Sequence, residues 1–107
     1  MELSVRSEAS AAVVTATGEL DIATTPQLRQ FLHAVLDEHD TPLVVDLTAV
    51  QFIDSTGLGV LVSVFKRLAG RGQALTLVSP HERLLRIFRL TALDRVFTIV
   101  PALPEPA

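Results

Sequence analysis

The sequence predicts an α/β fold: a mixed β-sheet with one antiparallel hairpin and otherwise parallel strands, flanked by about three helices. Short β-branched apolar runs alternate with longer runs whose apolar residues recur every three or four positions, a pattern typical of alternating strands and helices. The first two strand-like runs lie too close together for a helical crossover, which favours a hairpin between them. With 107 residues, of which 49% are hydrophobic, the chain is long enough for one domain with a dense core.

The N-terminal half is predicted to contain three strands and one helix. Strands are expected around residues 3–6, 13–17 and 43–47, the last apolar enough to be buried on both faces. The helix is expected to begin at Thr24-Thr25-Pro26-Gln27, where Thr24 and Gln27 resemble a capping box and proline suits the first turn. It should end near His39-Asp40, because Pro42 cannot continue it. Its predicted inward face consists of Leu28, Phe31, Leu32, Val35 and Leu36.

The C-terminal half is predicted to continue the alternation. A helix from about residue 55 to 68 should end at Gly70-Arg71-Gly72, followed by a strand at 74–78, a helix at 80–90 and a strand at 96–100. Val60 and Val64 fall outside the predicted inward stripe of the first of these helices, so either the sheet covers them or they form an exposed apolar strip for a partner. Residues 1–100 are taken as a single domain and residues 101–107 as a proline-rich, frayed tail.

Composition excludes several classes of function. The formal net charge of −3 argues against a nucleic-acid partner, whose phosphates require clustered positive charge. The chain has no cysteine, no apolar run long enough to span a membrane and no leader-like start, so a cytoplasmic protein without membrane association is expected. The scattered histidines His33, His39 and His81 are expected at the surface, and no metal or cofactor is predicted. Arg83, Arg86 and Arg89 are expected to form a solvated face of the last helix.

The most informative residues are Asp54 and Ser55, where an apolar strand is expected to end, the chain to turn and a helix to begin. A hydroxyl at a helix N-terminus either caps the helix or is a phosphorylation site whose charge switches an interaction. Gly57 and Gly59 in the first turn each cost about 1 kcal/mol in helix propensity, which suggests a bare backbone that a partner approaches. The acidic residues Glu19, Asp21 and Asp46 either serve local turns or form an acidic rim around Ser55. Neither a nucleophile elbow nor a phosphate-binding loop is present in the sequence.

Three segments resemble the anti-sigma factor antagonists (anti-anti-sigma factors) of the STAS domain family: Gly18-Glu19-Leu20-Asp21, Asp46-Leu47 and Phe52-Ile53-Asp54-Ser55-Thr56-Gly57-Leu58-Gly59. The resemblance covers about residues 3–100 and implies a STAS-like fold. It further implies phosphorylation of Ser55, with Thr56 as the alternative acceptor, by an anti-sigma factor that is a serine kinase using ATP and Mg²⁺. Asp21 matches a position in contact with that kinase, and a PP2C-type phosphatase is the implied counterpart. Many family members carry a further C-terminal helix where this chain ends.

The resemblance predicts a binding protein that is a substrate and not an enzyme. The unphosphorylated form should bind the kinase and release a sigma factor, and phosphorylation should abolish binding. The predicted partner-binding residues are Asp21, Asp54, Ser55, Thr56, Gly57 and Gly59. A monomer or weak dimer is expected. The alternative is a non-catalytic scaffold subunit of a larger signalling assembly, in which Ser55 and Thr56 are only helix caps; a small hydrolase using Ser55 ranks third.

Overall fold

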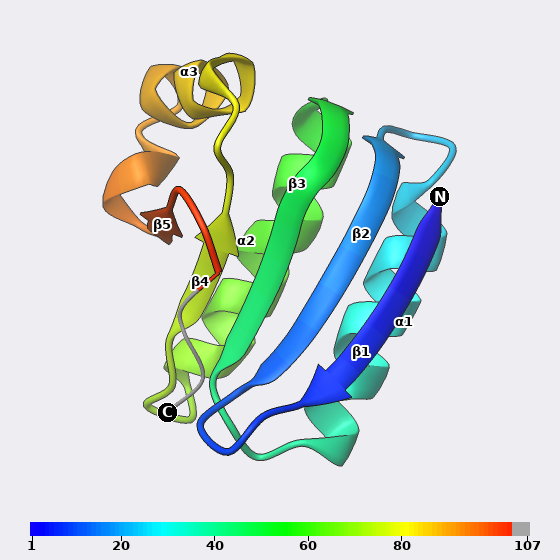
Figure 1. Cartoon of the computed structure of the whole chain (residues 1–107), viewed down its shortest axis with the longest axis vertical. Helices are drawn as coiled ribbons and strands as arrows, with labels where there is room; N and C mark the ends of the chain where they lie inside the picture. Colours follow the sequence, from blue (N-terminus) through cyan, green and yellow to red (C-terminus); the bar gives the residue numbers. More distant parts are fainter. Residues whose placement is uncertain (104–107) are drawn as a thin grey trace.

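A computed structural model describes residues 1–103, in which three α-helices and a short 3₁₀ helix connect or follow the strands of one five-stranded sheet. In chain order the elements are β1 (Glu2–Ser7), β2 (Ala12–Leu20), α1 (Thr25–Glu38), β3 (Leu43–Ile53), α2 (Ser55–Ala69), β4 (Leu75–Val78), α3 (Glu82–Leu90), η1 (Leu93–Arg95) and β5 (Thr98–Val100). Figure 1 shows α1 and α2 side by side behind the sheet, with α3 at the end of the sheet where β3 finishes.

The sheet has the strand order β1-β2-β3-β4-β5. β1 and β2 pair antiparallel, and all other neighbours pair parallel. The predicted mixed sheet with one hairpin is therefore confirmed. The main core fills the space between the sheet and the helices. On the opposite face, Leu103 packs against a smaller cluster of Val13, Val44 and Val78, although the sequence placed Leu103 in the frayed tail 101–107; residues 104–107 lie outside the described residues.

β3 is much longer than predicted. It continues to Ile53, so no turn separates the strand from Asp54 as the sequence suggested. Two register shifts against β2 explain the error, because each inserts one extra residue into β3 and breaks the alternation that marks a strand. β2 likewise runs through Glu19 and Leu20, which were expected in a loop. Gly18 lies at the second shift with φ of +107°, a backbone conformation that glycine adopts without strain.

The predicted capping box at the start of α1 is wrong. Thr24 occupies the N-cap position, but its side chain makes no capping hydrogen bond. Its hydroxyl instead donates to the backbone oxygen of Glu19 at 2.7 Å, and the Gln27 amide donates to the backbone oxygen of Met1 at 3.4 Å. Thr24 therefore bonds within the preceding loop and Gln27 bonds to the distant N-terminus, and no capping box forms. The predicted end of α1 agrees with the structure, where the last helical residue is Glu38.

The outward strip predicted as one option for α2 does not exist. Val60 and Val64 are both 0% exposed, because α2 packs against α1 as well as against β3 and β4. Leu58, Leu61 and Leu68 are buried as predicted, whereas the predicted inward residues Val62 and Phe65 are only partly buried.

The C-terminal elements are shorter than predicted. α3 begins at Glu82 instead of Pro80, and β5 begins at Thr98 instead of Val96. Phe97 is a buried core residue that precedes the strand, with its ring edge-on to the rings of Phe65 (6.0 Å between centroids) and Phe88 (6.1 Å). These aromatic contacts fasten α3 and the final strand to α2.

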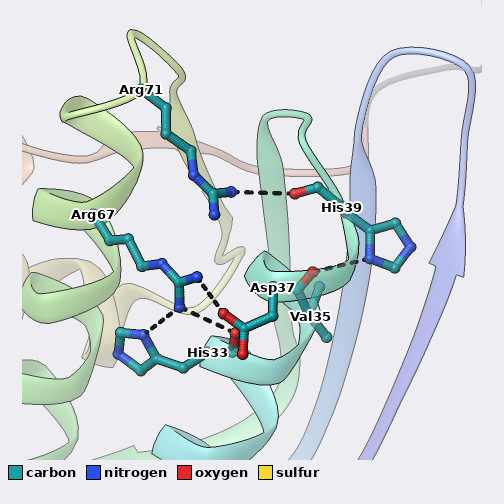
Figure 2. A network of polar contacts seen from close by, with 6 residues as sticks. All are labelled: His33, Val35, Asp37, His39, Arg67 and Arg71. Atoms are coloured by element: carbon teal, nitrogen blue, oxygen red, sulfur yellow. Dashed lines mark hydrogen bonds and ion pairs between the residues drawn. The ribbon is translucent and has the colours of Figure 1, made fainter.

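Polar contacts join α1 to α2 on the side away from the sheet (Figure 2). Arg67 of α2 donates to the backbone oxygen of His33 at 3.1 Å, to the ring Nδ1 of His33 at 3.2 Å, and to the Asp37 carboxylate. Arg71 donates to the backbone oxygen of His39 at 3.2 Å. His33 is therefore a partly buried member of a helix–helix network, whereas the sequence placed it simply at the surface.

Candidate functional site

The two key carboxylates lie at the same edge of the sheet. Leu20 and Ile53 are cross-strand partners at the ends of the parallel strands β2 and β3, so the residues that follow them, Asp21 and Asp54, leave the sheet side by side. The N–H of Asp54 donates to the backbone oxygen of Leu20 at 3.0 Å, which fixes the two chain exits to each other. Ser55 comes next and is the first residue of α2.

Asp54 caps α2. Its Oδ1 accepts hydrogen bonds from the N–H groups of Thr56 (2.9 Å) and Gly57 (3.1 Å) and from the hydroxyl of Thr56 (2.5 Å). The Thr56 hydroxyl is the main cause that lowers the pKa of Asp54, helped by the backbone N–H groups of Gly57, Thr56 and Ile22, and opposed by partial burial. The carboxylate is therefore ionised at neutral pH, where it also complements the positive end of the helix dipole.

The two hydroxyls that the sequence left as alternatives have different surroundings. Ser55 is exposed, and within residues 1–103 its side chain makes no hydrogen bond. Thr56 is partly buried, and its hydroxyl is bound to Asp54. Because the capping role belongs to Asp54, capping does not account for a serine at position 55.

The two glycines of the first turn also differ. Gly57 is buried, and a Cβ added there would lie 2.8 Å from both the Cβ and the backbone oxygen of Leu20. Gly57 is therefore required by packing inside the molecule and does not present the accessible backbone expected of it. Gly59 is exposed, and an added Cβ would meet nothing within 4 Å. Of the two, only Gly59 leaves bare backbone on the surface.

Only part of the expected acidic rim forms. Asp46 lies in the first half of β3 and is 9% exposed, on the order of 25 Å from Asp54 along the strand at about 3.3 Å per residue. Its Oδ1 accepts from the N–H (2.9 Å) and hydroxyl (2.6 Å) of Thr48. This is the same Asp-x-Thr arrangement that Asp54 makes with Thr56, used here inside a bulged strand. The Asp46 side chain therefore stabilises the local backbone of β3 and does not belong to the acidic rim.

Glu19 and Asp21 lie at the same end of the sheet as Ser55. Glu19 is exposed at the end of β2. Asp21 is partly exposed, and its Oδ1 accepts from the N–H groups of Ala23 (2.9 Å) and Thr24 (3.1 Å). Asp21 therefore organises the loop that leads into α1 while its carboxylate still reaches the surface.

Sequence reasoning missed two residues of this edge, Ile22 and Thr24. Thr24 donates to the backbone oxygen of Glu19 and accepts the N–H of Asp21 at 3.0 Å, closing the loop between β2 and α1. A threonine three positions after an aspartate was a signal for such a turn. Ile22 is 76% exposed in the same loop, and nothing in its sequence context distinguishes it.

The described chain also contains a surface pocket between the end of β3 and the start of α3. This pocket of about 460 Å³ is lined by Gln51, Pro80, His81, Glu82 and Arg83, none of which was predicted as a site residue. Within residues 1–103, no three potential metal-ligating side chains gather to hold an ion. No helix in that part of the chain has the length and apolar character needed to cross a bilayer.

Comparison with known proteins places the chain in a family. Residues 2–105 match the STAS domain. The chain is 39% identical over 82 residues to the anti-sigma-B factor antagonist of Listeria monocytogenes, covering 77% of this chain and 72% of that protein. It is 40% identical over 86 residues to the anti-sigma-B factor antagonist of Bacillus subtilis, covering 80% of this chain and 78% of that protein.

A solved structure agrees with these sequence matches. The crystal structure of an anti-sigma factor antagonist from Mycobacterium paratuberculosis superimposes with a TM-score of 0.79 at 34% identity, covering 95% of this chain and 86% of that one. The family match covers nearly the whole chain. It includes the five-stranded sheet and the serine at the start of α2. The protein belongs to the STAS domain family.

Proposed function

We propose that this protein is an anti-sigma factor antagonist that binds an anti-sigma serine kinase when unphosphorylated, and that phosphorylation of Ser55 abolishes the binding. Kinase binding releases a sigma factor, and a PP2C-type phosphatase restores the binding form. The names of the relatives, anti-sigma-B factor antagonists, support the general role. The observation that carries the choice of residue is the contrast between the exposed, unbonded hydroxyl of Ser55 and the Thr56 hydroxyl held by Asp54.

The electrostatics of the edge support a switch by repulsion. A phosphate on Ser55 adds about −1.5 to −2 charge at neutral pH, next to the ionised Asp54 and close to Asp21. In a docked complex the phosphate would be buried beside these carboxylates, so their mutual repulsion and the cost of desolvating the phosphate both disfavour binding. The positive end of α2 offsets only part of this charge. A 150-fold change in affinity, about 3 kcal/mol, lies within the usual range of such couplings.

In this role the chain is a substrate and a binding partner and performs no catalysis itself. The kinase supplies ATP and Mg²⁺, and the chain needs to contribute only an accessible hydroxyl on a rigid turn. The proposed role places the protein in the cytoplasm, where sigma factors act.

The mass of the intact protein after incubation with ATP, Mg²⁺ and the candidate anti-sigma kinase tests the proposal. Wild type should gain one phosphate, and Ser55→Ala should gain none. Ser63→Ala is a matched control, because Ser63 also lies on α2 but donates its hydroxyl to the backbone oxygen of Val60 at 2.8 Å; it should be phosphorylated like wild type. Phosphate retained by Ser55→Ala and lost in Thr56→Val would move the site to Thr56.

Binding measurements test the second half of the proposal. Ser55→Asp should bind the kinase at least 10-fold more weakly than wild type while keeping the wild-type circular dichroism spectrum. Equal binding by a folded Ser55→Asp would remove the electrostatic explanation. A large stable homo-oligomer in size-exclusion chromatography, together with no phosphorylation of wild type, would favour the scaffold alternative.

A further inference from the structure

Ile22 is an apolar side chain in an unusual place. It lies in the loop between β2 and α1, immediately after Asp21, and it is 76% exposed. Loops of this kind favour glycine, asparagine, aspartate and serine, each of which supports a turn, whereas a β-branched apolar residue contributes nothing to the turn itself. The backbone N–H of Ile22 is one of the groups that lower the pKa of Asp54, so this loop borders the residue that precedes Ser55.

The loop holds Ile22 in a fixed position. The Asp21 carboxylate accepts the N–H groups of Ala23 and Thr24, and the Asp21 backbone oxygen accepts the N–H of Thr25 at 2.9 Å. The Thr24 hydroxyl closes the loop by donating to the backbone oxygen of Glu19 at 2.7 Å. An apolar side chain on a preorganised loop loses little conformational freedom on binding, which is the property of a strong interface anchor.

Charge around the loop indicates the chemistry of the partner. Three acidic residues lie around Ile22: Glu19 and Asp21 precede it in the chain, and Asp54 accepts its backbone N–H. The whole chain carries a formal net charge of −3. A partner that covers Ile22 must bury its side chain in an apolar pocket and place basic groups opposite these carboxylates. The second strongly exposed aliphatic residue, Leu90, is 77% exposed but follows Arg86 and Arg89 at the end of α3, where the charges have the opposite sign.

We propose that Ile22 is the apolar anchor by which the anti-sigma kinase docks beside Ser55, and that the kinase receives it in an apolar pocket bordered by basic side chains. The proposal rests on the proposed function. Under this proposal the kinase recognises the protein through Ile22, which lies outside the phosphorylated turn. Binding of the kinase and transfer of phosphate to Ser55 then depend on different residues. Removing the anchor should therefore weaken binding and raise the KM for phosphorylation while kcat stays unchanged.

The test measures the Kd of the kinase for wild type, Ile22→Ala, Ile22→Leu and Leu90→Ala, with steady-state phosphorylation of the same four proteins. Ile22→Ala should bind at least 10-fold more weakly, with KM raised and kcat within twofold of wild type. Ile22→Leu should stay within threefold of wild type, because it keeps the apolar volume. Leu90→Ala, the control of equal exposure, should bind like wild type. Urea unfolding should give the same midpoint for Ile22→Ala as for wild type, because the side chain is in water.

The possible failures are distinguishable. If wild type is bound and phosphorylated at Ser55 but Ile22→Ala behaves the same, the anchor is wrong and the proposed function stands. An equal loss of kinase affinity in Leu90→Ala would also contradict the assignment of Ile22 as the anchor. Any exposed apolar side chain would then contribute equally to binding. If wild type is neither bound nor phosphorylated, the proposed function itself fails. Raising the salt concentration should weaken binding of wild type and Ile22→Ala by the same factor, since the carboxylates remain in both.

Discussion

Leu20 and Gly57 are in such close contact that a methyl group on Gly57 would lie 2.8 Å from both the Cβ and the backbone oxygen of Leu20. The same backbone oxygen accepts the N–H of Asp54. The end of β2 and the first turn of α2 are therefore packed as one unit, and this unit sets the position of Asp21 relative to Ser55. A glycine inside the helix, costly in propensity, is what allows the contact.

Gly57→Ala should destabilise the protein, whereas Gly59→Ala should stabilise it. Both substitutions gain about 1 kcal/mol in helix propensity. At Gly57 the added methyl meets backbone as well as side-chain atoms of Leu20, and overpacking of this kind costs about 1–3 kcal/mol, so a net loss of about 1 kcal/mol is expected. At Gly59 nothing lies within 4 Å of the added Cβ, so the propensity gain remains. Urea unfolding of the two variants measures the difference.

Gly57→Ala should also weaken kinase binding more than its stability loss explains, because it shifts the loop of Asp21 relative to Ser55. If Gly57→Ala were as stable as wild type, Leu20 would have moved aside without a cost in free energy. The positions at which Asp21 and Asp54 leave the sheet would then not be rigidly coupled.

Val60→Ala and Val64→Ala should each lower the free energy of unfolding by about 2 kcal/mol, the value for two lost methyl groups together with a small cavity. Both side chains are fully buried. Val5→Ala is the control, because Val5 is 40% exposed on the edge strand β1, and its change should stay within about 0.5 kcal/mol. If the α2 variants lost kinase affinity without losing stability, these valines would be accessible to the partner.

The order of strands and helices was predictable because each segment shows its own apolar periodicity. Leu43–Leu47 and Leu28–Leu36 are examples of a strand and a helix that can be identified in this way. The length of β3 was not predictable in this way. Its second half includes the extra residues of two register shifts, so polar and apolar residues cease to alternate before Ile53. The placement of Val60 and Val64 failed for a different reason, since a helix covered on two sides buries more than one stripe.

For the site, the sequence correctly indicated that a helix begins at Ser55, but it placed a turn before Asp54 where β3 continues to Ile53. It could not decide between capping by Ser55 and capping by Asp54, because both residue types cap helices and differ here only in backbone geometry. Gly57 was assigned to a partner because its contact, Leu20, is distant in sequence and belongs to another element. Contacts between different strands and helices, such as this one, cannot be predicted from the pattern of residues within one segment.

Thr56→Val should raise the pKa of Asp54 towards the ordinary aspartate value. The Thr56 hydroxyl is the largest of the groups that lower this pKa, and valine keeps the shape of threonine while removing the donor. Thr56→Ser is the control and should leave the pKa of Asp54 lowered. NMR titration of the Asp54 carboxyl carbon in the three proteins measures the shift.

A lowered pKa makes the Asp54 cap an acid-sensitive contribution to stability. The contribution is present above the unfolded-state pKa of about 4 and is lost as the pH falls through the folded-state value. Thr56→Val should weaken this pH dependence together with the pKa shift. An unchanged pKa in Thr56→Val would mean that the backbone N–H groups alone hold the carboxylate.

His33 should make the α1–α2 contact sensitive to mild acid (Figure 2). Its Nε2 lies 3.3 Å from the hydroxyl of Ser63, which already donates to a backbone oxygen, so Nε2 carries the proton and Nδ1 accepts from Arg67. Partial burial is the main cause that lowers the pKa of His33, followed by the charges of Arg67 and Arg29; the Asp37 carboxylate opposes them. Protonation would place an N–H on Nδ1 against the N–H of Arg67.

The sign of the effect follows from the lowered pKa. Just below the ordinary histidine pKa of about 6.5, the unfolded chain binds more protons at His33 than the folded chain does. The stabilisation is therefore complete above pH 6.5 and declines as the pH falls from there. Urea unfolding from pH 8 to pH 5 should show a larger loss of stability for wild type than for His33→Gln, which does not titrate.

Two neighbouring substitutions should move the His33 pKa in opposite directions. Arg67→Met removes a positive charge and a hydrogen-bond donor, so the pKa measured from the imidazole resonances should rise. Asp37→Asn removes the carboxylate that raises this pKa, so the pKa should fall further and the loss of stability below pH 6.5 should be larger in the variant. A rise in both variants would show that the substitutions act by opening the helix interface to water, which relieves the burial of His33, and that the charges of Arg67 and Asp37 contribute little.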